Sequence, residues 1–333
     1  MGRIGILILN LGTPDAPDPR SVRRYLGEFL SDRRVVEIPQ WLWQPILRGP
    51  ILLTRPRKSA HAYRQVWTDE GSPLAVHTRD VARGLADRFG GDLVVDWAMR
   101  YGNPSVKSRI DALVTAGCDR ILLAPLYPQY CAATTATALD AAYAALERMR
   151  VQPAIRTLPP YYDDPAYIAA LRASTQRQLA ALDFVPDLLV ASFHGMPERT
   201  RALGDPYYDQ CLVTARLLEK ALGRDVRPTF QSRFGPAKWL GPATDDVLRA
   251  LPGEGVSKVP VLTPGFSADC LETIEEIGIR GREDFIAAGG DKFARLDCLN
   301  ASADAMIFYQ GLVSRELAGW LDNGSFPFNK GLS

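Results

Sequence analysis

Ile4-Gly-Ile-Leu-Ile-Leu-Asn-Leu11 is a nearly continuous apolar run that passes directly into the turn residues Gly12-Thr-Pro-Asp15. Strands that are buried on both faces of a parallel sheet have such continuous apolar sequences, so the run predicts a buried parallel strand. One basic residue precedes the run and no small-residue cleavage site follows it, which argues against a secretory signal peptide. We therefore expect a cytoplasmic protein that begins with a buried strand.

Strand-like and helix-like patterns alternate along the rest of the chain. Further strand-like runs occur at Leu93–Met99, Arg120–Leu126, Ala154–Leu158, Leu188–Phe193, Arg227–Gln231, Lys258–Leu262 and Phe293–Leu296. Amphipathic helix patterns separate most of these runs, and such alternation is typical of parallel sheets covered by helices. The predicted fold class is therefore α/β, with two similar doubly wound Rossmann-like half-domains. Each half-domain is expected to contain a four-stranded parallel sheet flanked by helices.

The turn-rich segment Pro159–Pro165 divides the strand-like runs into two sets of four. This division predicts an N-terminal α/β half-domain over residues 1–158 and a C-terminal α/β half-domain over residues 159–300. A C-terminal segment, 301–333, is expected to form a helix from about 301 to 321 that packs back across both halves. A prior of about 150 residues per domain agrees with two halves in a chain of 333 residues.

Composition excludes several classes of function. The chain has 39 basic and 38 acidic residues, and a net charge of +1 gives no sign of a nucleic-acid partner. Its five cysteines are scattered and form no C-x-x-C pair, which argues against a zinc site or a disulfide framework. Neither a G-x-G-x-x-G nor a G-x-x-x-x-G-K-[ST] motif occurs, so a nucleotide-phosphate site is not expected.

His194 is one of three histidines, and it ends the predicted strand in Asp187-Leu-Leu-Val-Ala-Ser-Phe-His-Gly195. Imidazole binds metals and moves protons near neutral pH, and sites in α/β proteins form at the carboxyl ends of strands. A histidine beside a glycine is also commonly a turn residue that satisfies local backbone groups. The position alone leaves both interpretations open.

A cluster of carboxylates follows the predicted strand at 258–262. Residues 260–277 read as a strand, a Pro-Gly turn and a helix, with Asp269 near the helix N-terminus, where the macrodipole favours an anion. Glu272, Glu275 and Glu276 lie at i, i+3 and i+4, so an α-helix places them on one face. A solvated acidic face is one interpretation. Like charges at this spacing repel, and few basic residues lie nearby, so a path for a divalent cation or for protons is the alternative.

The segment 229–245 reads as a strand that runs into a loop rich in glycine and proline. The loop contains Arg233, Phe234, Lys238 and Trp239, a mixture of cations and aromatic faces that suits a flat apolar ligand with anionic edges. A rigid loop with Trp239 filling the core is the alternative interpretation.

Short motifs in a fixed order carry a resemblance to a known family. They are Leu9-Asn-Leu-Gly-Thr-Pro14, Gly71-Ser-Pro73, Arg100-Tyr101, Leu126-Tyr-Pro-Gln-Tyr130, Ser192-Phe-His-Gly-Met-Pro197, Gly204-Asp-Pro-Tyr207, Gln231-Ser-Arg-Phe-Gly-Pro236, Trp239-Leu-Gly-Pro242 and Asp269-Cys-Leu-Glu-Thr273. Over nearly its whole length the chain resembles the ferrochelatases, bacterial-type lyases that insert ferrous iron into a porphyrin. The resemblance implies Fe(II) insertion into protoporphyrin IX, with release of two protons, as the terminal step of haem biosynthesis.

The resemblance implies that His194 and Glu272 are the catalytic residues at the metal centre, both carried by the C-terminal half. It also implies that Asp269, Glu275 and Glu276 relay protons or the metal. Metallation removes two pyrrole N–H protons while hydrated Fe(II) loses its waters, so a base and metal ligands are both required. Whether His194 acts first as a base or as a ligand stays open.

The family pattern also implies a porphyrin cleft with a lip in the N-terminal half. Its expected lining consists of Leu11, Ser72, Arg100, Tyr101, Tyr127 and Trp239, with Arg55 and Tyr63 at the mouth. Arginines are suited to pair with propionates, and aromatic rings are suited to stack on the macrocycle.

Other features bear on the substrate and on cofactors. At position 11 the chain has leucine and resembles the relatives that use protoporphyrin. Relatives that use coproporphyrin tend to have tyrosine there. Cys270 replaces a histidine found in some members, which leaves His194 as the one imidazole in the matched motifs. No cysteine follows Cys298, so the iron–sulfur cluster of some relatives is not expected, and no prosthetic group is implied. Insertion into coproporphyrin III, another tetrapyrrole chelatase activity and a non-catalytic tetrapyrrole carrier remain as alternatives.

The segment Trp41–Leu53 is apolar but is interrupted by Arg48 and two prolines. It is shorter than the roughly 20 apolar residues that span a bilayer. A lip with a shallow peripheral contact at the inner face of the membrane is one interpretation, and a helix packed in the core is the other. A monomer or a weak homodimer is expected.

Overall fold

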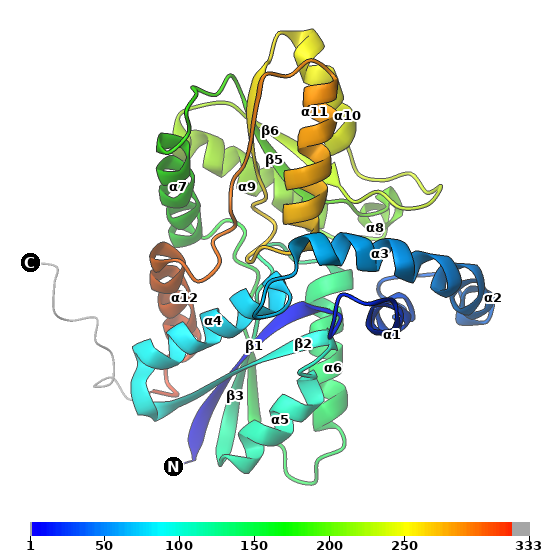
Figure 1. Cartoon of the computed structure of the whole chain (residues 1–333). Helices are drawn as coiled ribbons and strands as arrows, with labels where there is room; N and C mark the ends of the chain where they lie inside the picture. The colour runs from blue at the N-terminus through cyan, green and yellow to red at the C-terminus, as the bar shows by residue number, and fades with distance from the viewer. Residues whose placement is uncertain (1, 322–333) are drawn as a thin grey trace, which may run out of the picture.

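A computed structural model describes residues 2–321 of the chain and contains two four-stranded parallel sheets (Figure 1). The strand orders are β2-β1-β3-β4 and β6-β5-β7-β8. The strands are β1 Arg3–Thr13, β2 Leu93–Gly102, β3 Cys118–Pro125, β4 Ala154–Thr157, β5 Leu189–His194, β6 Val226–Gln231, β7 Lys258–Leu262 and β8 Lys292–Arg295. Each contains most of one predicted run, and the predicted fold class is confirmed.

Helices cover the sheets and connect successive strands. The α-helices are α1 Pro19–Leu30, α2 Gln40–Ile46, α3 Leu52–Val66, α4 Pro73–Phe89, α5 Val106–Thr115, α6 Thr137–Leu146, α7 Pro165–Ala180, α8 Glu198–Ala202, α9 Tyr207–Leu222, α10 Thr244–Ala250, α11 Arg282–Ala287 and α12 Ala303–Glu316. Among the described residues, η3 Ala132–Ala136 and η5 Glu272–Gly281 are π-helical, whereas η1 Leu47–Ile51 is kinked at Gly49, whose ψ of -111° is not helical. The short 3-10 helices are η2 Gly90–Asp92 and η4 Leu251–Glu254. None of the helices within residues 2–321 combines the length and apolar character that a bilayer crossing requires.

Strand β1 explains why the opening run of the sequence is continuously apolar. It pairs in parallel with β2 on one side and β3 on the other, so both of its faces are covered. Ile6 and Ile8 point into the largest hydrophobic core, whereas Leu7 and Leu9 point into the core on the opposite face. Alternate side chains therefore enter different cores, and both sets have to be apolar.

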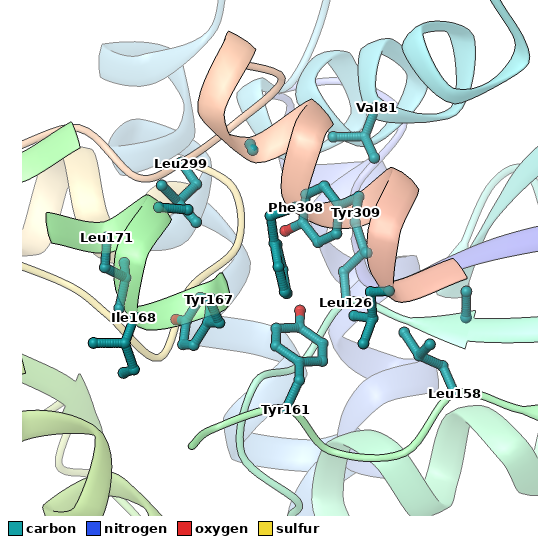
Figure 2. Packing of buried hydrophobic residues seen from close by; sticks show 14 of the residues in the cluster. Val81, Leu126, Leu158, Tyr161, Tyr167, Ile168, Leu171, Leu299, Phe308 and Tyr309 are labelled. Carbon is teal, nitrogen blue, oxygen red and sulfur yellow. The ribbon is translucent and has the colours of Figure 1, made fainter. Parts of the chain in front are cut away.

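Helix α12 joins the two halves, as Figure 1 shows by its position beside α7 and α4. Figure 2 shows Phe308 and Tyr309 of α12 among Tyr161 and Tyr167, and the ring centroids of Tyr161 and Phe308 lie 5.3 Å apart. On α4, a Cβ added at Gly84 would lie 3.0 Å from the Cε of Met306, so glycine permits the two helices to approach closely. One hydrophobic core therefore contains residues of both sheets.

The final helix is shorter than the sequence predicts. It ends at Glu316, and Gly319 then adopts a positive φ of 76° in a turn. Glycine tolerates that backbone conformation, which a helix cannot continue through. The last part of the predicted C-terminal segment, residues 322–333, lies outside the described residues.

Candidate active site

A pocket of about 860 Å³, its open mouth included, lies where β1 and β5 reach their carboxyl ends. Such ends are the usual position of sites in open α/β sheets. Six of the residues predicted for the site line this pocket: Leu11, Tyr63, Ser72, Tyr127, His194 and Glu272. The structure therefore brings together an imidazole and a carboxylate that are 78 positions apart in the sequence, 272 minus 194.

His194 is the last residue of β5, and its ring has a defined tautomer. Its Nδ1 lies 2.6 Å from the carbonyl oxygen of Gly195. Because a carbonyl oxygen only accepts hydrogen bonds, Nδ1 carries the proton and donates it there. The lone pair on Nε2 is then available to accept a proton or to bind a metal. His194 therefore satisfies a local backbone group through Nδ1.

Glu272 is the first residue of η5 and faces two phenols of the N-terminal half. Burial, and to a lesser extent the Glu272 carboxylate, raises the pKa of Tyr25 and of Tyr63 well above the usual range. Both phenols therefore remain neutral at physiological pH and contribute hydroxyl groups, not charge. The negative charge on this wall of the pocket comes from Glu272.

Cys270 also lines the pocket, two residues before Glu272. Burial and the neighbouring Glu272 carboxylate raise the pKa of its thiol well above the usual range. A thiol held in the protonated form is a weak ligand, because the thiolate is the species that binds metals. Cys270 therefore contributes a neutral thiol to this wall of the pocket.

The three carboxylates predicted as a relay do not line the pocket beside Glu272. Asp269 is buried and accepts hydrogen bonds from Arg295 at 2.6 Å, from Thr273 at 2.8 Å and from the side chain of Asn300 at 2.7 Å. Glu275 is ion-paired with Arg280, its Oε1 lying 2.9 Å from Nε. Both carboxylates are thus occupied by structural partners. Their relay role remains a prediction.

Glu276 has partners of its own, and the helix that carries it differs from the predicted type. The spacing predicted an α-helix, whereas Glu272–Gly281 is π-helical. The wider turn of a π-helix changes which residues share a face, so positions i, i+3 and i+4 no longer form one stripe. Glu276 instead accepts hydrogen bonds from the backbone N–H, at 2.7 Å, and the hydroxyl of Ser232.

Arg100 and Tyr101 were predicted to line the cleft, but neither is among the residues that line the pocket. The Arg100 guanidinium donates to Asp32 Oδ2 at 2.5 Å and to the Thr137 hydroxyl at 2.7 Å. The Tyr101 hydroxyl donates to the same oxygen of Asp32 at 2.9 Å. Burial opposes ionisation of Asp32, but the hydrogen bonds and the guanidinium outweigh it and lower its pKa. This network fixes the segment that follows α1 to β2 and to α6.

We expect the Asp32→Asn variant to be less stable than the wild type by about 3 kcal/mol, because it leaves the Arg100 guanidinium without its anion. The folded-state pKa of Asp32 lies below its unfolded value of 3.8, so this contribution is full above that pH and is lost as the pH falls through the folded pKa. Urea unfolding at about pH 7 and about pH 3 measures the difference.

Asp140→Asn is the matched control for this prediction. Asp140 is ion-paired with Arg34, but its side chain is 51% exposed, so its loss is expected to change stability by at most about 1 kcal/mol. Equal losses in the two variants at neutral pH would contradict a special role for the Asp32 network.

Trp239 and Arg55 also lie outside the pocket lining. Trp239 donates from Nε1 to the carbonyl of Phe234 at 2.9 Å and packs behind Gly195, where an added Cβ would lie 3.3 Å from the indole. The Arg55 guanidinium of α3 lies over the Phe234 ring at 4.0 Å. Trp239 thus supports the strand end that carries His194, and Arg55 bridges the N-terminal lip to a loop of the C-terminal half.

Several lining residues were not predicted from the sequence. They include Asn10, Thr13, Tyr25, Gln129, Phe266 and Cys270. Asn10, Thr13, Gln129 and Cys270 lie inside the motifs that match the family, and membership in those motifs is the signal that could have identified them. Thr13 donates to the Ser72 hydroxyl at 2.7 Å, and Asn10 donates to the Thr78 hydroxyl at 3.1 Å, so the pocket wall beside β1 is fixed by polar contacts.

Solved structures with a similar fold include chelatases. SirB from Bacillus subtilis, solved with Fe3+, superposes with a TM-score of 0.59 at 13% identity, over 96% of this chain and 97% of that chain. The sirohydrochlorin chelatase SirB of the subspecies spizizenii, in complex with cobalt, gives 0.55 at 12% identity, over 95% and 96%. At such identities the likeness shows the fold alone, which is that of the chelatase class.

Sequence comparison places the chain within that class. The Ferrochelatase family model matches residues 3–317. Ferrochelatase from Rhizobium meliloti (strain 1021) is 54% identical over 96% of both chains, and ferrochelatase from Agrobacterium fabrum is 51% identical over 96% of this chain and 95% of its own. The chain belongs to the ferrochelatase family, enzymes that insert a metal into a porphyrin, and the resemblance inferred from the motifs is confirmed.

Proposed function

We propose that the protein inserts Fe(II) into protoporphyrin IX, releases two protons and forms protohaem, the terminal step of haem biosynthesis. The observation that carries the proposal is the presence of the His194 imidazole, with Nε2 available, and the Glu272 carboxylate in one pocket. A cleft with an imidazole and a carboxylate supplies both a base for the pyrrole protons and an oxygen ligand for the incoming ion.

The two groups come from different elements and perform complementary tasks. The His194 lone pair either accepts a pyrrole proton or ligates the ion, and one lone pair cannot do both at once. The Glu272 carboxylate attracts the cation and provides a ligand as the hydrated ion loses water. Asp269, Glu275 and Glu276 extend the acidic region beyond the pocket and are proposed to relay protons or the ion toward Glu272.

The walls of the pocket are suited to holding a flat macrocycle. Leu11, Tyr25, Tyr63, Tyr127 and Phe266 supply apolar and aromatic surface to the lining. Insertion requires a ring distorted so that the nitrogen lone pairs rise out of the plane, and rigid walls that bind the distorted ring favour the transition state over the ground state. The fixed wall beside β1 is proposed to act in this way.

Leu11 favours protoporphyrin IX over coproporphyrin III. Its side chain presents apolar surface to the pocket, which suits the vinyl groups of protoporphyrin better than the additional charged propionates of coproporphyrin. Arg55 and Arg100 are engaged with Phe234 and Asp32, so they would have to exchange these partners to pair with propionates.

The proposal is tested by incubating the protein with Fe(II) and each porphyrin, following porphyrin fluorescence and the absorption of the metallated product. We expect protohaem to form from protoporphyrin IX with a higher kcat/KM than the product from coproporphyrin III. Faster turnover of coproporphyrin III would show that coproporphyrin III, and not protoporphyrin IX, is the preferred substrate. Fluorescence quenching without a metallated product would identify a tetrapyrrole carrier.

The side chains of the segment Trp41–Leu53 divide into a buried set and an exposed set. Trp43 and Leu47 are buried in a hydrophobic core, whereas Trp41 is 76% and Leu53 is 65% exposed. Figure 1 places α2 at the periphery of the molecule. We propose that the exposed apolar face, which also includes Leu42 and Ile46, contacts the inner face of the membrane.

The combined Trp41→Ser and Leu53→Ser variant tests this contact. We expect the wild type to co-sediment with vesicles that contain anionic lipid, and the variant to bind at least about fivefold less, because apolar side chains no longer enter the interface. Val185→Ser is the control, because Val185 is 76% exposed and lies in a loop far from the lip in sequence. Equal binding by all three proteins would reject the contact.

The remaining expectations are proposals as well. The protein is inferred to be cytoplasmic apart from this contact, to act as a monomer or weak homodimer, and to carry no prosthetic group. All five cysteines are buried and free of disulfide bonds. An iron–sulfur absorption band in the purified protein would overturn the expectation that no cluster is bound.

A further inference from the structure

Gln231 connects the strand that carries His194 with the helix that carries Glu272. It is the last residue of β6, it is 3% exposed, and it pairs with His194 in the register of β5 and β6. It is not among the residues that line the pocket. Any contribution it makes to metal insertion therefore acts through other residues.

The side chain of Gln231 has both of its polar atoms engaged. Its Nε2 donates to the backbone carbonyl of Glu272 at 2.9 Å, and its Oε1 accepts from the hydroxyl of Ser192 at 2.7 Å. The carbonyl of Glu272 only accepts, so the amide nitrogen must face it and the orientation of the amide is fixed. Ser192 is fully buried and comes from the same strand as His194.

The backbone of Gln231 orients His194, the other residue of the proposed metal site. Its carbonyl accepts the N–H of Gly195 at 2.7 Å, and the carbonyl of Gly195 in turn accepts the Nδ1 proton of His194 at 2.6 Å. A Cβ at Gly195 would lie 2.5 Å from the Gln231 oxygen, so the close approach requires glycine. The orientation of the imidazole therefore depends on where Gln231 lies.

We propose that Gln231 is a positioning residue that sets the separation between His194 and Glu272. This inference rests on the proposed function. One residue fixes the carbonyl that orients the imidazole and, through its amide, the first turn of the π-helix that presents the carboxylate. Positioning within fractions of an ångström matters because a base and a ligand must address the same macrocycle at once.

The test replaces Gln231 with methionine, which has a similar length and no hydrogen-bonding amide. With Fe(II) and protoporphyrin IX as probes, we expect kcat to fall at least tenfold and the KM for Fe(II) to rise. The dissociation constant for protoporphyrin IX, measured by fluorescence, should remain within twofold of the wild-type value, because the porphyrin walls are unchanged.

Thr229→Val is the matched control. Thr229 lies two residues earlier on β6, on the same face of the strand, and is also fully buried, with its hydroxyl accepting from Thr244 at 2.9 Å. Its loss should lower the thermal midpoint while kcat and the KM for Fe(II) stay within twofold. If Gln231→Met retains wild-type kcat, or loses no more than Thr229→Val, the inference is overturned.

Ser192→Ala is the second variant, for use if Gln231→Met does not fold. It removes the hydroxyl that orients the amide and leaves Gln231 in place. We expect a fall in kcat of at least threefold with unchanged porphyrin binding, and kcat equal to that of Thr229→Val would overturn the inference. The wild type is assayed in parallel, because absence of insertion by the wild type would reject the proposed function instead.

Discussion

The His194→Ala variant is expected to lose iron insertion by at least about 100-fold, since positioned proton transfer contributes about 100- to 10,000-fold to catalysis. The substitution removes the lone pair on Nε2, whether that lone pair takes a pyrrole proton or binds the ion. Binding of protoporphyrin IX should remain within a few-fold, because the apolar walls of the pocket do not depend on the imidazole. Initial rates of protohaem formation and porphyrin fluorescence quenching measure the two quantities.

His61→Ala controls for the loss of an imidazole as such. His61 lies on α3, is exposed, and is not among the residues that line the pocket. Its replacement should leave the rate of insertion within twofold of the wild-type rate. A His194→Ala protein that metallates protoporphyrin at the wild-type rate would remove the mechanism proposed for this site.

The Glu272→Gln variant is expected to reduce kcat/KM for Fe(II) by at least about 100-fold at neutral pH. The substitution keeps the size of the side chain and removes its charge, so the pocket loses the anion that attracts a divalent cation and displaces its water. The KM for protoporphyrin IX should change little. Steady-state kinetics with each substrate varied in turn separate the two effects.

Glu283→Gln is the matched control for the second prediction. Glu283 lies in α11, which continues the same helical segment, and is exposed. Its neutralisation changes the net charge of the protein by the same amount without altering the pocket. An equal loss in both variants would show that long-range charge, and not a carboxylate in the pocket, accounts for the effect.

The strands of this fold could be predicted because burial leaves a local signal. A strand covered on both faces is apolar at most positions, and residues 4–11, with Asn10 as their polar exception, fall entirely within β1. His194 could be predicted as a candidate site residue for a related reason, because the end of a buried apolar strand can be located from the sequence. The pairing of His194 with Glu272 was implied by family motifs and not by any property of either residue.

The parts of the site that could not be predicted depend on contacts between distant residues. Arg100 and Tyr101 were placed in the cleft, but Asp32, 68 positions from Arg100, binds both of them elsewhere. The π-helical form of η5 was not predicted either, and the residues that bond its first turns are distant in sequence: Gln231 ends β6 and Ser232 directly follows it. Tyr25 lies in an ordinary amphipathic helix, and nothing in its sequence neighbourhood distinguishes it as a pocket residue.

The location of α12 has a consequence for biosynthesis. Val81 and Leu85 of α4 and Leu171 of α7 all belong to the core that α12 completes, although α12 is the last helix of the described residues. Chains commonly begin folding from the N-terminus while they are still being translated. Here the apolar side chains of α4 and α7 that pack against α12 stay exposed until residues 303–316 have been synthesised. The nascent chain is therefore expected to bind chaperones, and to stay sensitive to proteases, until residues 303–316 have emerged from the ribosome and packed.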